Sequence, residues 1–191
     1  MIILLNGPPG SGKDTAAEFI TLMLGNSQVM HEKMSWPMKR GLTTIFSFND
    51  AERKALNAYK DHSNGPEFAD MSWRLMQIDI YHYLARRYGK DILGRLLMRR
   101  NRDNAKRHTV ISDAGRNDEI VPIVKGFSYG QVGYIELHRE GCNFDNDIRE
   151  YLDHKHFKHV EVIENKYDLE MFQAQIRKVL RKWELLDGGD N

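Results

Sequence analysis

Continuous apolar runs and alternating patterns predict five β-strands along the chain. The run IILL at residues 2–5 is apolar throughout, which is typical of a parallel strand buried on both faces. The stretch HTVIS at residues 108–112 predicts a second central strand. Together, the strand candidates are residues 2–5, 29–35, 108–112, 131–137 and 160–163.

Between these strands, apolar residues recur at helical spacing. In residues 15–24 they share one face, and Gly25 follows as a C-terminal cap. The helix candidates are residues 15–24, 37–46, 50–60, 71–88, 91–101, 117–125 and 168–180. Strands that alternate with helices predict an α/β fold with a parallel sheet and crossover connections.

The stretch NGPPGSGKDT at residues 6–15 joins the first strand to the first helix. Gly7, Gly12 and Lys13 fit the phosphate-loop pattern G-x-x-x-x-G-K. In such a loop, backbone N–H groups and the positive end of the helix bind phosphate, and the lysine contacts the β- and γ-phosphates of ATP. The residues expected around the ATP phosphates are Gly7, Pro8, Pro9, Gly10, Ser11, Gly12, Lys13, Asp14 and Thr15.

Asp14 stands where the usual pattern has a magnesium-binding serine or threonine. A carboxylate is itself a good Mg²⁺ ligand, directly or through water. The alternative is that Asp14 only complements the positive end of the helix dipole. The sequence leaves both interpretations open.

A second acidic residue, Asp113, directly follows the strand HTVIS. An acid at the carboxyl end of a central strand is expected to hold Mg²⁺ or its waters, so Asp14 and Asp113 are the candidate metal ligands. Arg116 follows in the sequence DAGR. It could clamp phosphate oxygens, or it could form an ordinary salt bridge within its loop.

Composition adds few constraints. The chain has 191 residues, enough for one domain with a small lid or insert, and a formal net charge of +1, which does not by itself indicate nucleic-acid binding. Cys142 is the single cysteine, which excludes an internal disulfide and favours a reducing compartment. Since no signal peptide and no membrane-length apolar run is found, we expect a cytoplasmic protein without membrane contact.

Six short stretches resemble a known family when they are taken in order. They are GKDT (residues 12–15), WPMKRGL (36–42), WRLMQ (73–77), DAGRNDE (113–119), LHREG (137–141) and VIEN (162–165). Together they resemble the bacteriophage deoxynucleoside monophosphate kinases and the wider adenylate-kinase-like group of P-loop kinases. The resemblance spans nearly the whole chain. An Asp after the loop lysine recurs in that family, so Asp14 matches it.

The resemblance implies a single three-layer P-loop kinase domain over residues 1–191, with five parallel strands. It also implies a helical acceptor-binding insert at about residues 36–106 and a lid at about residues 139–158. The chain departs from the family in two places that bear on the acceptor: the family's glycine after WRLMQ is absent, and the acceptor region is short.

The resemblance also assigns roles to individual residues. Lys39, Arg40 and Arg74 would face the acceptor. Arg139 and Arg149 would approach the transferred phosphate from the lid. Asn165, Lys166 and Tyr167 would border the donor base. The catalytic set would then be Lys13, Asp113, Arg116 and Arg139.

Three further patterns have simpler explanations. The sequence NKYD at residues 165–168 imitates the guanine-binding motif of GTPases, but Asp168 is better explained as a helix N-cap. His154, His156 and His159 lack the partners of a zinc site. Arg95, Arg99 and Arg102 share one face of a helix in a basic run, which is either solvated or a contact surface for DNA.

Three functions follow from these features. The first is an ATP- and Mg²⁺-dependent kinase that transfers the γ-phosphate to a deoxynucleoside monophosphate. The second is a phage kinase that phosphorylates 5-hydroxymethyluracil within DNA, in the cytoplasm of an infected host. Its hydroxyl acceptor would need a general base, and Asp61 and Asp79 are unassigned candidates. The third is a nucleotide-binding switch or NTPase without an acceptor.

Overall fold

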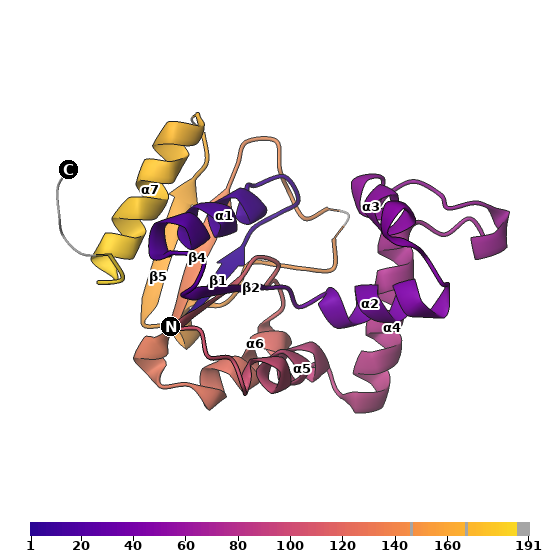
Figure 1. Ribbon diagram of the computed structural model, residues 1–191, viewed down its shortest axis with the longest axis horizontal. Helices are drawn as coiled ribbons and strands as arrows, with labels where there is room; N and C mark the ends of the chain where they lie inside the picture. The colour runs from indigo at the N-terminus through magenta and orange to yellow at the C-terminus, as the bar shows by residue number, and fades with distance from the viewer. Residues whose placement is uncertain (146, 167, 187–191) are drawn as a thin grey trace. The chain divides into compact units, whose positions relative to one another are not determined.

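The computed structural model of the chain describes residues 1–145, 147–166 and 168–186 (Figure 1). Five strands form one sheet in the order β2-β3-β1-β4-β5, and all neighbouring pairs are parallel. They are β1 (Ile2–Asn6), β2 (Val29–Glu32), β3 (His108–Ile111), β4 (Val132–His138) and β5 (His159–Glu164). The prediction of a five-stranded parallel sheet is confirmed.

The described residues also form seven α-helices. They are α1 (Lys13–Leu24), α2 (Trp36–Ile45), α3 (Asp50–Ala58), α4 (Trp73–Tyr88), α5 (Ile92–Asn101), α6 (Asn117–Gly126) and α7 (Leu169–Lys182). Each overlaps a predicted helix. Short 3₁₀ turns lie at Pro66–Phe68, Tyr129–Gln131 and His154–His156. In the described part of the chain, no helix has the length and apolar character needed to cross a membrane.

The strand predicted at residues 29–35 ends early, at Glu32. The neighbouring strand β3 ends at Ile111, so the chain beyond Glu32 has no parallel ladder to extend. The backbone N–H of Met34 instead donates to the Asp113 carboxylate at 2.6 Å. The Asp113 carboxylate therefore accepts a hydrogen bond that a neighbouring strand would accept if β2 continued.

The chain divides into two compact units. The first comprises Met1–Met34 and Gly94–Asn191, and the second comprises Ser35–Leu93. The second unit overlaps the acceptor-binding insert that we expected at about residues 36–106, and that insert stays a prediction. Leu97 of α5 packs with Ile111 and Ile120 in the core of the first, sheet-containing unit.

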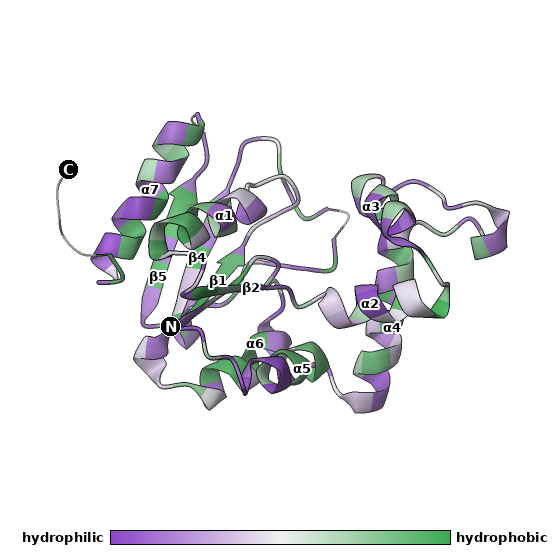
Figure 2. Ribbon diagram, viewed as in Figure 1, coloured by the Kyte–Doolittle hydropathy of each residue, from purple (hydrophilic) through white to green (hydrophobic). Residues whose placement is uncertain are grey.

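The first unit has three layers, because alternate residues of β1 face opposite sides of the sheet. Ile3 and Leu5 pack against α1 and α7, whereas Ile2 and Leu4 pack against α5 and α6. The green strands and inner helix faces in Figure 2 show these two apolar layers. Leu152 and Phe157 also join the layer of α5 and α6, so part of the expected lid segment packs onto the sheet.

The second unit has a core of its own, formed by α2, α3, α4 and the turns between them. Trp73 is fully buried there, beside Leu42 and Met76. Asn49 begins α3 with a capping box. The Asn49 side chain accepts from the backbone N–H of Glu52, and the Glu52 carboxylate accepts from the backbone N–H of Asn49. Ser72 caps α4 by accepting from the N–H of Leu75.

Candidate phosphate-binding site

The candidate site lies at the carboxyl ends of the parallel strands in the first unit. From β1 the chain runs through α1 to β2 on one side, and from β3 it runs through α6 to β4 on the other side of β1. In open α/β sheets, ligands bind where the strand order reverses in this way. The glycine-rich loop follows β1, so it lies at this switch point.

The loop conformation depends on glycine. Gly12 precedes α1 in the left-handed region, with φ of 99°. A Cβ atom at this position would lie 2.7 Å from Nδ2 of Asn165. Both the positive φ and the lack of space therefore favour glycine here. The loop therefore turns sharply enough to direct the first backbone N–H groups of α1 toward an anion.

Lys13, the first residue of α1, folds its side chain back into the loop. Its Nζ donates to the carbonyl oxygens of Gly7 and Pro8, both at 2.6 Å, and lies 3.4 Å from Ser11 Oγ. Burial, and then the positive charge of Arg149, lower the pKa of Lys13 from 10.5 to about 8. A phosphate would give this ammonium group a charged acceptor in place of two neutral carbonyls.

This is the P-loop fold. A strand, a glycine-rich phosphate loop and a helix carrying the loop lysine form its defining unit. Here that unit sits centrally in a parallel three-layer α/β structure.

The chain was compared with known proteins. No family model and no curated protein sequence matches it. Among solved structures, it is similar to a thymidylate kinase from Candida albicans, with a TM-score of 0.49 and 13% sequence identity, over 100% of this chain and 95% of that chain. A likeness of this size carries no substrate, residue role or activity over to this chain.

Asp14 lies at the mouth of the P-loop with two polar partners. Its Oδ1 accepts from Ser112 Oγ and pairs with Lys33 Nζ, both at 2.7 Å. Partial burial raises the pKa of Asp14, but these two hydrogen bonds lower it more, so the net shift is downward. His31 Nε2 lies 2.8 Å from Ser112 Oγ and extends the chain of contacts.

Asp113 follows β3 and reaches the connection between β2 and α2 through the N–H of Met34. Asp14, Asp113 and Asp147 all raise the pKa of Lys13, which shows that these carboxylates share its electrostatic environment. The described residues contain no group of three metal-binding side chains. Mg²⁺ usually needs only one or two carboxylates beside phosphate and water, so Asp14 and Asp113 fit its chemistry.

Arg116 and Glu119 contact each other in the segment that follows Asp113. Arg116 Nη1 donates to the carbonyl of Ile148 at 3.2 Å, and Nε lies 3.6 Å from Glu119 Oε1. Arg116 therefore contacts residues of its own unit, and its role toward phosphate stays a prediction. Burial raises the pKa of Glu119 from 4.5 to about 8, and the Arg116 charge offsets this only in part.

Arg139 and Asn165 brace the backbone of the P-loop. Arg139 Nη1 donates to the carbonyl of Gly10 at 3.2 Å, and Asn165 Nδ2 donates to that of Ser11 at 3.0 Å. Lys166 pairs with Glu164 at 3.1 Å. Tyr167, expected near the donor base, lies outside the described residues. Asp168 caps α7 by accepting from the N–H of Met171, as predicted.

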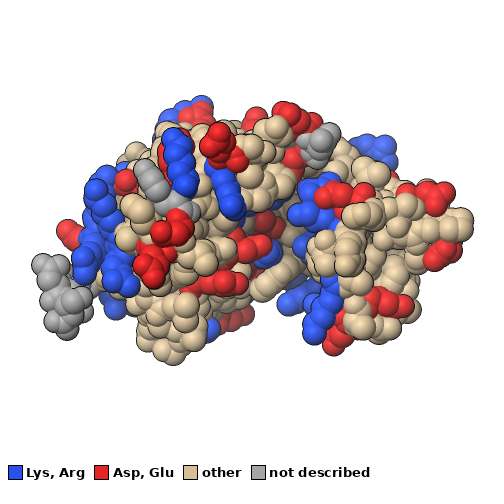
Figure 3. Space-filling model, turned by 90° about the horizontal axis from the view of Figure 1, so that it is seen from above, with Lys and Arg blue, Asp and Glu red and all other residues tan. Residues whose placement is uncertain are grey.

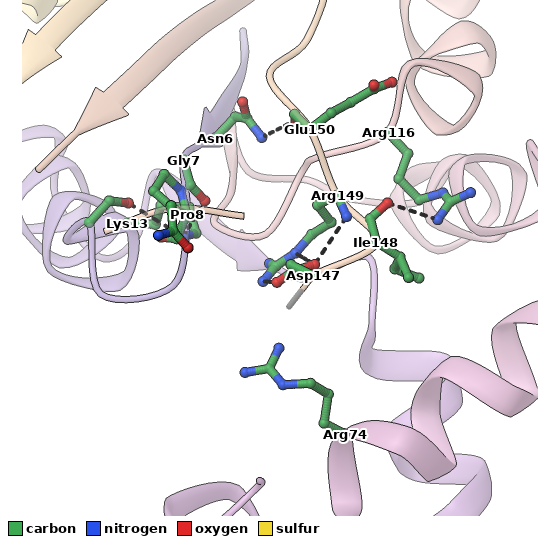
Figure 4. A network of polar contacts seen from close by, with 12 residues as sticks. Asn6, Gly7, Pro8, Lys13, Arg74, Arg116, Asp147, Ile148, Arg149 and Glu150 are labelled. Atoms are coloured by element: carbon green, nitrogen blue, oxygen red, sulfur yellow. Dashed lines mark hydrogen bonds and ion pairs between the residues drawn. The ribbon is translucent and has the colours of Figure 1, made fainter. Parts of the chain in front are cut away.

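Arg149 lies beside the P-loop lysine (Figure 4). Its guanidinium is paired with Asp147. Burial lowers the pKa of Arg149, but the hydrogen bond and charge of Asp147 raise it more. The backbone around Arg149 is anchored to the sheet: Glu150 N–H donates to Gly115 O at 2.8 Å, and Asn6 Nδ2 donates to Glu150 O at 3.1 Å.

The three residues expected to face the acceptor all belong to the second unit. Lys39 Nζ donates to Asn57 Oδ1 at 3.0 Å, and Arg40 stacks on Trp36 at 5.5 Å from the ring centroid. Arg74 pairs with Asp61 through Nε at 2.5 Å and Nη2 at 3.3 Å. Asp61 is thus engaged in an ion pair, and Arg74 lowers its pKa.

Two of the other patterns can be located in the structure. His154 hydrogen-bonds Glu136 at 2.9 Å, and among the described residues no three-ligand metal group forms around the three histidines. Arg95, Arg99 and Arg102 converge on one hollow of about 340 Å³, which Met98 and Pro122 also line.

Sequence reasoning missed several residues of the site: Asn6, Lys33, Ser112, Glu119 and Asp147. Asn6 and Ser112 each directly follow an apolar run, and that position was the available signal. Lys33 carries no local signal, because the fold brings it to its distant partner Asp14. Glu119 and Asp147 pair with arginines only three and two residues away, and what the sequence does not show is that these side chains are buried.

Proposed function

We propose that this protein is an ATP- and Mg²⁺-dependent phosphotransferase whose acceptor is a deoxynucleoside monophosphate. The observation that supports it best is the convergence of Lys13 and Arg149 at the P-loop, with Asp14 and Asp113 in the same electrostatic environment. Two cations at this loop can bind the negatively charged phosphates of ATP, and two carboxylates can hold the Mg²⁺ that accompanies them. A cytoplasmic location would supply both nucleotides.

Phosphoryl transfer to a monophosphate needs no general base, because the acceptor oxygen is already ionised. Catalysis is then positioning and neutralisation of charge. The P-loop N–H groups and Lys13 would hold the β- and γ-phosphates, and Arg149 would neutralise the transferred group. Asp14 and Asp113 would hold Mg²⁺, which when bound would neutralise negative charge on the phosphates.

The remaining assignments follow the same proposal. Lys39, Arg40 and Arg74 bind the anionic acceptor. Arg116 and Arg139 support the transferred phosphate, with Arg139 acting partly through its hydrogen bond to the loop carbonyl of Gly10. The donor base is bordered by Asn165, Lys166 and Tyr167.

The test is a transfer assay with Mg-ATP and each of the four deoxynucleoside monophosphates. We expect a diphosphate product from at least one of them, and loss of more than about 100-fold in rate for Lys13→Met, because an oriented charged contact at the transferred phosphate is removed. Lys178→Met, at an exposed position of α7, is the matched control. No product from any of the four would refute a monophosphate acceptor.

The metal assignment has its own test. In the Asp14→Ser variant, the Mg²⁺ concentration for half-maximal rate should rise about tenfold, because one charged oxygen ligand is replaced by a neutral one. Asp145→Asn, an exposed acid of another loop, serves as the control. An unchanged Mg²⁺ dependence would leave Asp14 with only its helix-terminal role.

A second candidate function is phosphorylation of 5-hydroxymethyluracil within DNA. The observation that favours it is the hollow of about 340 Å³ lined by Arg95, Arg99 and Arg102, which could contact the backbone of a nucleic acid. By contrast, the face in Figure 3 interleaves acidic and basic residues. A strand of DNA would therefore be held on the side of α5.

Radiolabel transfer from ATP to hydroxymethyluracil DNA, compared with transfer to free monophosphates, separates the two functions. If DNA is the acceptor, Arg99→Ala with Arg102→Ala should weaken labelling of DNA about tenfold and reduce its dependence on salt. If both acceptors remain unlabelled while ATP is slowly hydrolysed, the protein is a nucleotide-binding switch.

A further inference from the structure

The guanidinium of Arg149 is held by a carboxylate of its own loop. Its Nε donates to Asp147 Oδ1 at 2.8 Å, and Nη2 donates to Oδ2. The backbone N–H of Arg149 also donates to Oδ1, at 3.0 Å. The Asp147 side chain is only 5% exposed, so this pair is a part of the packed structure and not a surface ion pair.

The stem of Arg149 is confined as well. It lies against the backbone of Gly115, where a Cβ atom would be 2.8 Å from Cβ, Cγ and Cδ of Arg149. Gly115 O also accepts from Glu150 N–H at 2.8 Å. Asn6 bridges the two segments, because its Nδ2 donates to Ala114 O at 2.7 Å and to Glu150 O at 3.1 Å. Backbone, stem and head group of Arg149 are thus each held by a different contact.

The way in which Asp147 binds Arg149 leaves one edge of the guanidinium for another acceptor. A guanidinium carries five N–H donors in a planar fork. Asp147 takes the edge formed by Nε and Nη2. The other edge, formed by Nη1 and Nη2, has the geometry for a second bidentate contact with phosphate oxygens. Figure 4 shows the side chains of Asp147 and Arg149 close together, joined by a dashed line.

We propose that Asp147 is a positioning residue, which turns the Nη1–Nη2 edge of Arg149 toward the polyphosphate bound at the P-loop. The inference rests on the proposed function for the identity of that ligand, a nucleoside triphosphate. Asp147 itself touches no phosphate. It acts through Arg149. Gly115 contributes to the same positioning, because the absence of a side chain there leaves room for the arginine stem.

Asp147 could act through its negative charge or by positioning Arg149, and the two roles predict opposite effects of its removal on polyphosphate binding. Asp147 is an acid close to an anion site, so if it acted only through its charge, its removal would tighten polyphosphate binding. If it positions Arg149, its removal weakens binding although a negative charge is lost. The sign of the effect therefore separates the two roles.

The first experiment measures binding of inorganic tripolyphosphate with Mg²⁺ to the full chain by calorimetry. We expect Asp147→Asn to weaken binding about tenfold, the loss that follows when a hydrogen bond to a charged group is disrupted. Asp145→Asn, an exposed acid two residues away, should leave binding unchanged. Tighter or unchanged binding by Asp147→Asn would overturn the proposal.

A second variant reaches Arg149 without changing any charge. Gly115→Ala forces the arginine stem to move, so it should weaken tripolyphosphate binding to a similar extent. Combining either substitution with Arg149→Lys should weaken binding little beyond Arg149→Lys alone, since all three disturb one contact. Independent, multiplicative effects would show that Asp147 does not act through Arg149. Unfolding midpoints of all variants identify any that fail to fold.

The same variants are then compared in the transfer assay. If the wild-type chain binds tripolyphosphate but transfers phosphate to no acceptor, the proposed function fails while the binding results still decide the role of Asp147. If transfer occurs, the rate should fall in Asp147→Asn and Gly115→Ala by at least as much as binding weakens. A normal transfer rate in both would overturn the positioning role.

Discussion

Glu119 shows how burial changes the chemistry of a single residue. Its carboxyl group lies at the start of α6, 3% exposed, between the charges of Arg116, Asp113 and Arg149. Burial outweighs the two arginines and raises its pKa to about 8. The folded protein therefore keeps Glu119 protonated at pH values where the unfolded chain has already released that proton.

This shift makes stability depend on pH. The contribution of protonated Glu119 is complete below about pH 4.5 and is lost as pH rises to about 8, with a slope of at most about 1.4 kcal/mol per pH unit. Glu119→Gln should remove this slope, so the variant should resemble wild type at pH 5 and exceed its stability at pH 8.5. Urea unfolding at both pH values measures this.

The neighbouring exposed acid gives the control for that experiment. Asp118→Asn should change the dependence of stability on pH far less than Glu119→Gln does, because the exposed Asp118 charge is the smallest of the named contributions to the Glu119 pKa. If Glu119→Gln and wild type show equal slopes, Glu119 is ionised in the folded protein and its contact with Arg116 is a true ion pair.

The contact between α5 and α6 depends on the absence of a side chain at Gly94. A Cβ atom there would lie 1.9 Å from the carbonyl oxygen of Glu119 and 3.3 Å from Pro122 Cδ. The two helices therefore approach so closely that backbone meets backbone. This approach also places the arginines of α5 beside Pro122, where they line the hollow described above.

Gly94→Ala should accordingly destabilise the protein by about 2 kcal/mol or more, because overpacking outweighs the gain of about 1 kcal/mol that alanine brings to a helix. Denaturant unfolding of the full chain measures the change. In Gly130→Ala the nearest atom would be 3.6 Å away, so that variant should stay within about 0.5 kcal/mol of wild type. A stable Gly94→Ala variant would mean that α5 can shift away from α6.

At the scale of the whole molecule, the apolar clusters described above divide between the two units. The sheet-containing unit packs on both faces of its strands, whereas the unit of Ser35–Leu93 packs around Trp73. Each core is made of residues from its own unit, so each should respond separately to the loss of a large buried side chain.

Trp73→Ala should remove about 3–5 kcal/mol from the second unit. Hydrogen exchange should show lost protection in α2 and α4, while β1 and β4 keep theirs. Tyr83→Ala, an exposed aromatic position on the same helix, should leave both units protected. Equal loss of protection in the strands and in α4 would show that the two units unfold together.

The sequence by itself determined the elements and the P-loop. Apolar periodicity reports which face of a segment is buried, so it located the strands and helices, and the spacing of Gly7, Gly12 and Lys13 located the anion site. It also explained Asp168 as a cap, since capping is local. The sequence did not predict where β2 ends, because that end depends on where β3 stops and on the contact of Asp113 with Met34.

Only the tertiary structure decided which distant residues meet around the P-loop. The strand order brings Lys33 and Ser112 to Asp14, and Gly115 and Asn6 to the segment that carries Arg149. It also assigned most of α5 to the sheet-containing unit. Such contacts join residues about 20 to more than 140 positions apart, and no local pattern encodes them, because their partners are chosen by the packing of the sheet.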